Sequence, residues 1–190
     1  MTHTLTRTVP GSLQAQAQAS NTSLAETFLN CDLVVLVDTS GSMDAHDAPG
    51  YQKRYDAACA ELAAIQKKHP GKIGVIAFSS TVMFCPGGVP PFLSGGTDLA
   101  AALDYVHLLD GLCEIVVISD GEPNSPDAVL QQAKRFTQSA ISCVYIGPEG
   151  GSGQAFLAKL ARASSGQAVM AAKTAQLAAR LEPLLLAAGV

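Results

Sequence analysis

Tryptophan is absent from this 190-residue sequence, charged residues make up only 15% of it, and no run of lysine or arginine occurs. Because a nucleic-acid surface needs clustered positive charge and the net charge is −4, we expect no DNA or RNA partner. No apolar stretch approaches the roughly 18 residues that a membrane-spanning helix needs. The threonine-rich start, residues 1–10, lacks the apolar core of a signal peptide. These absences predict a soluble, non-secreted protein that does not bind a membrane.

Cysteine is also sparse, and its five positions, an odd number, contain no Cys-x-x-Cys motif. Zinc and thiol-redox motifs are therefore missing from the sequence. Most of the cysteines lie in or beside apolar segments, where a free thiol packs as a small hydrophobic group. Free thiols favour a reducing compartment, so we expect a cytoplasmic location. The five residues are Cys31, Cys59, Cys85, Cys113 and Cys143.

Length and composition predict one domain. The 190 residues, 48% of them hydrophobic, can bury a sizeable core but are few for two domains. The beginning of the chain is rich in threonine, serine, alanine and glutamine and has no sustained apolar period. We therefore predict a flexible N-terminal arm over residues 1–26 and a folded domain over residues 27–190.

Within this domain, apolar runs of strand length alternate with segments of helical period, which is typical of a parallel sheet covered by helices on both faces. Strands are predicted over 32–37, 73–78, 81–85, 114–119, 141–146 and 167–171. Only two serines separate the second and third strands, so these two should pair antiparallel at the sheet edge. Helices are predicted over 51–68, 97–109, 126–139, 154–163 and 174–187. The predicted fold class is α/β: a doubly wound, Rossmann-like, mostly parallel six-stranded sheet with one antiparallel edge strand.

Polar residues that can bind a metal gather where these strands end. The first strand leads into Asp38, and the stretch 38–42 brings one carboxylate and two serine hydroxyls close together. The fourth strand ends at Asp120, and Thr97 follows the turn 94–96. The five candidate metal ligands, in chain order, are Asp38, Ser40, Ser42, Thr97 and Asp120.

With the pattern Asp-x-Ser-x-Ser, a distant threonine and a distant aspartate, the chain resembles a von Willebrand factor A domain with a complete metal-ion-dependent adhesion site. The resemblance extends over roughly residues 31 to 188. It implies the strand order 3-2-1-4-5-6, which brings the first and fourth strands, and with them both aspartates, side by side. It also implies direct ligation by both serines, direct or water-mediated ligation by the threonine, and largely water-mediated ligation by the aspartates.

All five candidates offer oxygen, which favours Mg²⁺, with Mn²⁺ or Ca²⁺ as alternatives, over zinc or copper. Adjacent strands lie about 4.8 Å apart, so two bare carboxylates at their ends would repel each other unless a dication lay between them. Gly41 allows the tight turn that lets the hydroxyls on either side face one point. Asp98, beside Thr97, is expected to cap the following helix or to be solvated instead of binding the metal.

The resemblance implies a metal-dependent protein–protein interaction module that binds an Asp or Glu of a partner protein. Intracellular members of the family often serve as adaptors beside MoxR-type AAA+ ATPases or as subunits of larger complexes. We therefore predict that the chain is not an enzyme. A Mg²⁺-dependent hydrolase and a structural scaffold subunit with a non-essential metal site stay open as alternatives. The sequence does not predict the oligomeric state.

Two enzyme classes find little support in the sequence. A haloacid-dehalogenase-like phosphotransferase needs a second carboxylate two residues after its first aspartate, and Ser40 stands at that place. A nucleotide-binding loop at Gly151-Ser152-Gly153 would need a third glycine, where Phe156 stands, and no Walker-type lysine is present. This loop is expected to be a flexible crossover.

Overall fold

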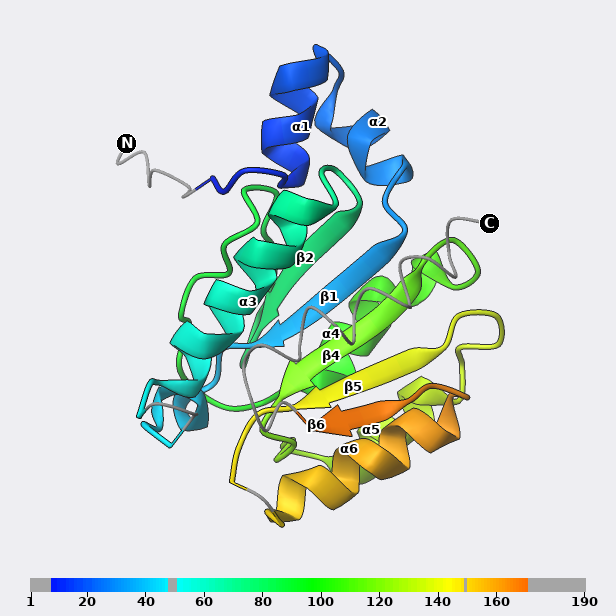
Figure 1. Ribbon diagram of the computed structural model, residues 1–190. Helices are drawn as coiled ribbons and strands as arrows, with labels where there is room; N and C mark the ends of the chain where they lie inside the picture. Colours follow the sequence, from blue (N-terminus) through cyan, green and yellow to red (C-terminus); the bar gives the residue numbers. More distant parts are fainter. Residues whose placement is uncertain (1–7, 48–50, 149, 171–190) are drawn as a thin grey trace.

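The computed structural model describes residues 8–47, 51–148 and 150–170, and its centre is one sheet with helices on both faces (Figure 1). The strands follow the order β3-β2-β1-β4-β5-β6. In this sheet β2 and β3 pair antiparallel and the other neighbours pair parallel, as the sequence predicts for a doubly wound α/β fold. The strands are β1 (Leu33–Asp38), β2 (Ile73–Phe78), β3 (Val82–Phe84), β4 (Glu114–Ser119), β5 (Ile141–Tyr145) and β6 (Ala168–Met170).

Helices α4, α5 and α6 pack on one face of the sheet, and α3 covers part of the other face. The predicted helix over 174–187 lies outside the described residues. Helix α5 begins with Ser125 as its N-cap and proline at its first position, although the Ser125 side chain makes no capping hydrogen bond. The helices are α1 (Leu13–Ser20), α2 (Leu24–Leu29), α3 (Arg54–Lys68), α4 (Leu99–Val106), α5 (Pro126–Ala133) and α6 (Ser152–Ala163), with 3₁₀ turns η1 (Gly41–Asp44) and η2 (His107–Leu109).

The central strand β1 is buried along its whole length. Its side chains alternate between the two cores: Val34 and Leu36 face the helices α4, α5 and α6, whereas Leu33, Val35 and Val37 face α3. A continuous apolar run is what a parallel strand covered on both faces requires. Because the run ends at Asp38, the first polar side chain appears where the strand leaves the core.

Helix α3 follows the 3.6-residue period. Ala58, Leu62 and Ile65 are buried against the sheet. Two lysines in the last turn of the helix stabilise it through their attraction to the negative end of the helix dipole. The helix ends before Gly71, which has a positive φ of 73°. Helix α3 starts close to the carboxyl end of β1 and runs back toward the amino ends of the strands (Figure 1).

Residues 8–26 belong to the stretch predicted as a flexible arm; in the structure they contain α1 and the start of α2, and they pack on the domain. Leu13 is buried, and the Gln14 backbone N–H donates to the Pro86 carbonyl oxygen at 2.9 Å. At Gly11, a Cβ atom would lie 1.9 Å from the Gln66 carbonyl oxygen, so only glycine allows this close approach to α3. Helix α1 contributes few apolar side chains to the core, so its sequence shows no sustained apolar period.

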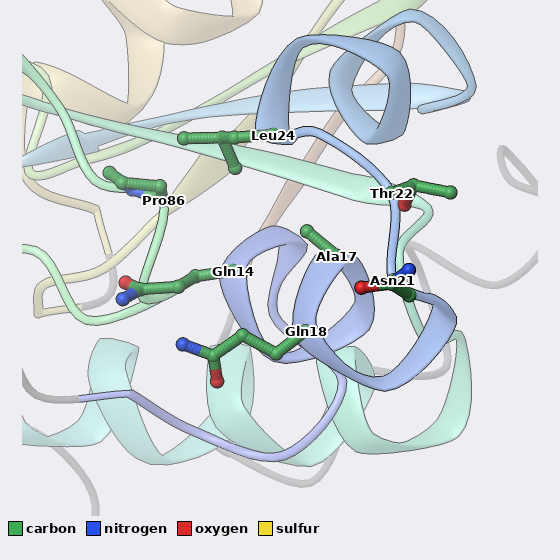
Figure 2. A pocket seen from close by; sticks show the side chains of 7 residues that line it. All are labelled: Gln14, Ala17, Gln18, Asn21, Thr22, Leu24 and Pro86. Atoms are coloured by element: carbon green, nitrogen blue, oxygen red, sulfur yellow. The ribbon is translucent and has the colours of Figure 1, made fainter.

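Helices α1 and α2 are joined by a short turn and lie at the opposite end of the molecule from the arrowhead of β1 (Figure 1). The Ser12 side chain caps α1, and Ser23 and Glu26 form a capping box at α2. Between the two helices lies an open pocket of about 550 Å³ bordered by Gln14 and Gln18 of α1, Leu24 of α2, and Pro86 (Figure 2). No helix among the described residues is long and apolar enough to cross a membrane.

Candidate metal centre

The two predicted aspartates lie at neighbouring strand ends. Strands β1 and β4 run parallel and side by side, with Val37 in register with Ile118 (Figure 1). Asp38 is the last residue of β1, and Asp120 directly follows β4. Both carboxylates are buried. The structure therefore brings two acidic side chains together at the carboxyl edge of the sheet, where open α/β sheets bind ligands.

Asp38 is held by two hydrogen bonds. The Ser119 hydroxyl donates to Asp38 Oδ2 at 2.6 Å, and the Ser40 backbone N–H donates to Asp38 Oδ1 at 2.9 Å. The Gly121 N–H in turn donates to the Ser119 hydroxyl at 2.9 Å. Ser119, the last residue of β4, therefore orients the Asp38 carboxylate at the end of β1. The sequence alone did not predict this role of Ser119.

The two serine hydroxyls lie next to each other. The Oγ atoms of Ser40 and Ser42 are 3.2 Å apart; Ser40 is buried and Ser42 is exposed. The Gly41 N–H donates to the Gly95 carbonyl oxygen at 3.1 Å, which ties this loop to the turn before Thr97. The turn thus faces both hydroxyls toward one point, with Ser42 on the solvent side.

Thr97 is buried and fixed by contacts with the loop after β4. Its backbone N–H donates to Asn124 Oδ1 at 3.0 Å, and the Asn124 N–H donates back to the Thr97 carbonyl oxygen at 2.9 Å. The Asp98 side chain accepts from the Ala101 N–H at 3.0 Å and caps α4, as predicted. These two hydrogen bonds tie Thr97 to the loop that carries Asn124.

Asp120 is paired with Arg54, the first residue of α3, which sequence reasoning missed. Arg54 Nη1 donates to Asp120 Oδ2 at 2.9 Å, while Nε and Nη2 donate to the two oxygens of Asp47 at 2.6 Å each. The other oxygen, Asp120 Oδ1, is buried and has no hydrogen-bond partner among the described residues. A buried carboxylate oxygen without a partner is costly, and a bound cation would satisfy it.

Burial raises the pKa of Asp38 to about 6. Hydrogen bonds from Ser119 and Ser40 act in the opposite direction, and the neighbouring Asp120 charge raises the pKa further. Ionisation of Asp38 is therefore less favourable in the metal-free protein than for an aspartate exposed to solvent. A dication near both carboxylates would reverse this, because an opposite charge at close range favours ionisation.

The donor set fits a hard divalent cation. Across the part of the chain that the structure describes, no three His, Cys, Asp or Glu side chains come together, so a metal here would rely on two carboxylates and hydroxyls. Oxygen-only donors suit Mg²⁺, Mn²⁺ or Ca²⁺. The neighbouring carboxylates, the adjacent serine hydroxyls and the unpaired Asp120 Oδ1 all agree with such an ion.

Gly153 has a packing role beside this centre. A Cβ atom at Gly153 would lie 1.8 Å from the Asp120 carbonyl oxygen, so α6 starts directly against the candidate site. Ser152 donates to Glu122 Oε1 at 2.7 Å. The close approach of the Gly153 backbone to the Asp120 backbone explains why glycine stands at position 153. A phosphate-binding role is not needed to explain this glycine.

The fold is that of the von Willebrand factor type A class. The structure is similar to a von Willebrand factor type A protein from Catenulispora acidiphila, at 17% identity, covering 84% of this chain and 42% of that chain with a TM-score of 0.62. It is also similar to the manganese-loaded TRAP protein from Plasmodium vivax, at 21% identity, covering 82% of this chain and 73% of that chain with a TM-score of 0.61.

A further similar structure is an aerotolerance-related membrane protein from Bacteroides fragilis NCTC 9343, determined with multiple mutations to serines. The identity is 16%, the match covers 83% of this chain and 99% of that chain, and the TM-score is 0.68. No protein-family model and no curated protein sequence matches the chain. At such identities the similarity establishes the fold, and the function must be argued from the site.

Proposed function

We propose that the chain is a protein-interaction module that holds a divalent cation at Asp38, Ser40, Ser42, Thr97 and Asp120 and binds an acidic side chain of a partner protein through it. The observation that carries this proposal is Asp120 Oδ1, a buried carboxylate oxygen without a partner among the described residues, next to a second buried carboxylate. Arg54 pairs with the other oxygen of Asp120, so a bound dication would satisfy the oxygen that is left without a partner.

Mg²⁺ is the expected cation, with Mn²⁺ or Ca²⁺ as alternatives. When bound, it would supply a Lewis-acidic centre that attracts an anionic oxygen. The two aspartates balance its charge, and the hydroxyls of Ser40, Ser42 and Thr97 add lone pairs without adding charge. The manganese in the TRAP protein of Plasmodium vivax supports a divalent cation in this fold.

The partner is expected to present Asp or Glu. Ser42 is exposed beside the buried ligands, so the candidate site is open to solvent on that side. A carboxylate that replaces a water molecule there would add a charged ligand to a cation whose aspartate ligands are buried. Thr97 is the proposed sensor, because its backbone hydrogen bonds with Asn124 link it to the loop after β4.

We propose no catalytic activity for this site. Ser40 stands two residues after Asp38, where a dehalogenase-like phosphotransferase would need a carboxylate for proton transfer. A Mg²⁺-dependent hydrolase is the alternative. Phosphoester turnover that disappears in Asp38→Ala would support the hydrolase and contradict the interaction module.

The biological setting is also a proposal. We place the protein in the cytoplasm, as an adaptor or as a subunit of a larger assembly, for example one linked to a MoxR-type AAA+ ATPase. The alternative is a structural scaffold subunit whose metal site is not needed for assembly. Partner binding that is indifferent to chelators would favour the scaffold.

Calorimetric titration with MgCl₂ tests the cation site directly. The wild type should bind one Mg²⁺, and Ser40→Ala and Asp120→Ala should abolish the binding heat. Ser125→Ala is the matched control, because this exposed serine follows the loop of Asn124 and makes no capping hydrogen bond. Equal binding heats in all four proteins would place the cation elsewhere and contradict the proposal.

A further inference from the structure

Two neighbouring ion pairs join η1 and the residues that follow it to the start of α3. Lys53 Nζ lies 2.5 Å from Asp44 Oδ1, and Arg54 Nη2 lies 2.6 Å from Asp47 Oδ2. The two pairs consist of the same charges, and their cations are adjacent in the chain. They differ because Arg54 also pairs with the candidate metal ligand Asp120, so the second pair is part of the candidate metal centre.

The Arg54 guanidinium is shared unequally between two carboxylates. Its Nε and Nη2 donate to the two oxygens of Asp47 at 2.6 Å each, and its Nη1 donates to Asp120 Oδ2 at 2.9 Å. A bidentate contact is the stronger arrangement for an arginine and a carboxylate. Asp47 therefore fixes the orientation of the guanidinium, which presents its third nitrogen to Asp120.

The guanidinium is partly shielded from solvent. The Arg54 side chain is 13% exposed and that of Asp120 is 3% exposed, whereas the Lys53 side chain is 37% exposed. Charges shielded in this way interact more strongly than charges in water, and salt screens them less. We therefore expect the charge of Arg54 to act on Asp120 and the charge of Lys53 to have little effect there.

The charge of Arg54 opposes a cation at the same carboxylate. Arg54 binds Oδ2 of Asp120, and Oδ1 has no hydrogen-bond partner in the part of the chain that the structure describes. A dication bound to Asp120 would share this carboxylate with the guanidinium, and two positive groups at one carboxylate repel each other. In the metal-free protein, by contrast, Arg54 compensates the buried carboxylate. Arg54 therefore favours the metal-free state.

Asp47 limits this effect of Arg54. Its carboxylate neutralises part of the guanidinium charge, and both of its oxygens accept hydrogen bonds from Arg54. The Asp47 side chain is 41% exposed, so it can be reached from solvent. Without the charge of Asp47, Asp120 would face a less neutralised guanidinium, and a dication would meet stronger repulsion.

We propose that Arg54 is a built-in counter-charge that stabilises Asp120 in the metal-free protein and lowers the affinity of the site for its divalent cation, and that Asp47 sets the strength of this effect. The inference rests on the proposed function, because it requires a cation at Asp120. Arg54 acts through Asp120 and is therefore a positioning residue. Because such coupling is reciprocal, any change that withdraws Asp47 from Arg54 would weaken cation binding.

Calorimetric titration of the full chain with MgCl₂ tests the role of Arg54. At a fixed ionic strength of about 0.15 M, Arg54→Gln should bind Mg²⁺ about tenfold more tightly than the wild type. Lys53→Gln is the matched control, since it removes the same charge from the neighbouring residue and should change the affinity by less than about twofold. Arg54→Lys keeps the charge and should restore an affinity close to that of the wild type.

The role of Asp47 is tested by a double-mutant cycle in the same assay. Asp47→Asn should bind Mg²⁺ about fivefold more weakly than the wild type, because Arg54 then lacks its neutralising partner. Asp44→Asn, which removes the acidic member of the neighbouring pair, should bind Mg²⁺ normally. The double variant Arg54→Gln/Asp47→Asn should bind like Arg54→Gln, since Asp47 acts through Arg54.

The outcomes separate this inference from the proposed function. If Arg54→Gln bound Mg²⁺ like Lys53→Gln, or more weakly than the wild type, the counter-charge would be excluded while the cation site remained. The same holds if Asp47→Asn weakened Mg²⁺ binding equally with and without Arg54. No binding of Mg²⁺ by the wild type would overturn both the proposed function and this inference.

Discussion

The Arg54 guanidinium donates to Asp120 Oδ2 at 2.9 Å, and this cation from the first turn of α3 compensates one of the two buried carboxylates. The same guanidinium binds both oxygens of Asp47. The two carboxylate oxygens of Asp120 therefore differ. Oδ2 pairs with Arg54, while Oδ1 has no hydrogen-bond partner among the described residues. Arg54 orients Asp120 and leaves one oxygen available to a metal.

The Arg54→Gln variant should be less stable than the wild type in EDTA, by about 2 kcal/mol, because it leaves Asp120 buried without its cation. The loss stays below that of a fully buried pair, since Arg54 is partly exposed. Mg²⁺ should restore part of this stability, because the dication supplies the missing charge. Urea denaturation of both proteins, with and without Mg²⁺, measures the effect.

Lys53→Gln is the control for this prediction. It removes the neighbouring ion pair with Asp44, which is exposed to solvent, and should leave stability almost unchanged. If Arg54→Gln and Lys53→Gln behaved alike, Arg54 would have no special role at Asp120.

The positions of the two candidate aspartates at neighbouring strand ends could be predicted from the sequence, because each follows a local signal. The apolar runs mark where β1 and β4 end, and Asp38 and Asp120 come at these ends. Arg54 could not be predicted, since its contact with a residue 66 positions away depends on where α3 begins. Local patterns do not encode such a distance.

The two N-terminal helices were missed for a different reason. Their apolar content is low, and the packing of Leu13 depends on the distant loop at Pro86. Local signals were present: Ser12 precedes α1, and Ser23 with Glu26 has the spacing of a capping box. Caps mark where a helix starts, but they do not say whether it packs on the domain.

Asp38→Asn should change how stability depends on pH. In the metal-free wild type, burial raises the pKa of Asp38 from 3.8 to about 6, so the folded state binds a proton more tightly than the unfolded state. The stability linked to this proton is fully present below pH 3.8 and is lost as pH rises through about 6. The loss is on the order of 2–3 kcal/mol.

Asparagine carries no charge and can still form hydrogen bonds with Ser119 and Ser40, so the variant should lack this pH dependence. In EDTA at neutral pH it should be as stable as the wild type or more stable, and it should bind no Mg²⁺. Denaturation on both sides of pH 5 measures this. Failure of the variant to fold in EDTA would mean that the Asp38 carboxylate is required structurally.

Gly153→Ala tests the packing of α6 against the candidate site. The added Cβ would lie 1.8 Å from the Asp120 carbonyl oxygen, so either α6 or the loop after β4 must move. We expect a loss of about 2–3 kcal/mol and weaker Mg²⁺ binding. Gly150→Ala is the control: it adds a methyl group in open space and should cost only about 1 kcal/mol through its positive φ. Normal Mg²⁺ affinity in Gly153→Ala would show that the position of Asp120 does not depend on this contact.

Leu13→Ala tests whether the N-terminal helices belong to the domain. Leu13 is buried, so truncation should cost about 2–4 kcal/mol in chemical denaturation. Ala19→Gly, on the exposed face of the same helix, should cost only about 1 kcal/mol. If Leu13→Ala were as stable as the wild type, residues 8–26 would not contribute to the stability of the domain, in agreement with the predicted flexible arm.

The central claim is that a cation held by this chain binds an acidic side chain of a partner, and Thr97→Ala in a partner-capture assay tests it most directly. Capture is measured by the full chain in Mg²⁺ and in EDTA, and Mg²⁺ affinity is measured separately by calorimetry. We predict a partner that is retained in Mg²⁺, released by EDTA, and lost when one of its own acidic residues is replaced. Thr97→Ala should weaken its capture far more than it weakens Mg²⁺ binding. Persistence of the complex in EDTA, together with normal capture by Thr97→Ala, would contradict the claim and favour the structural scaffold.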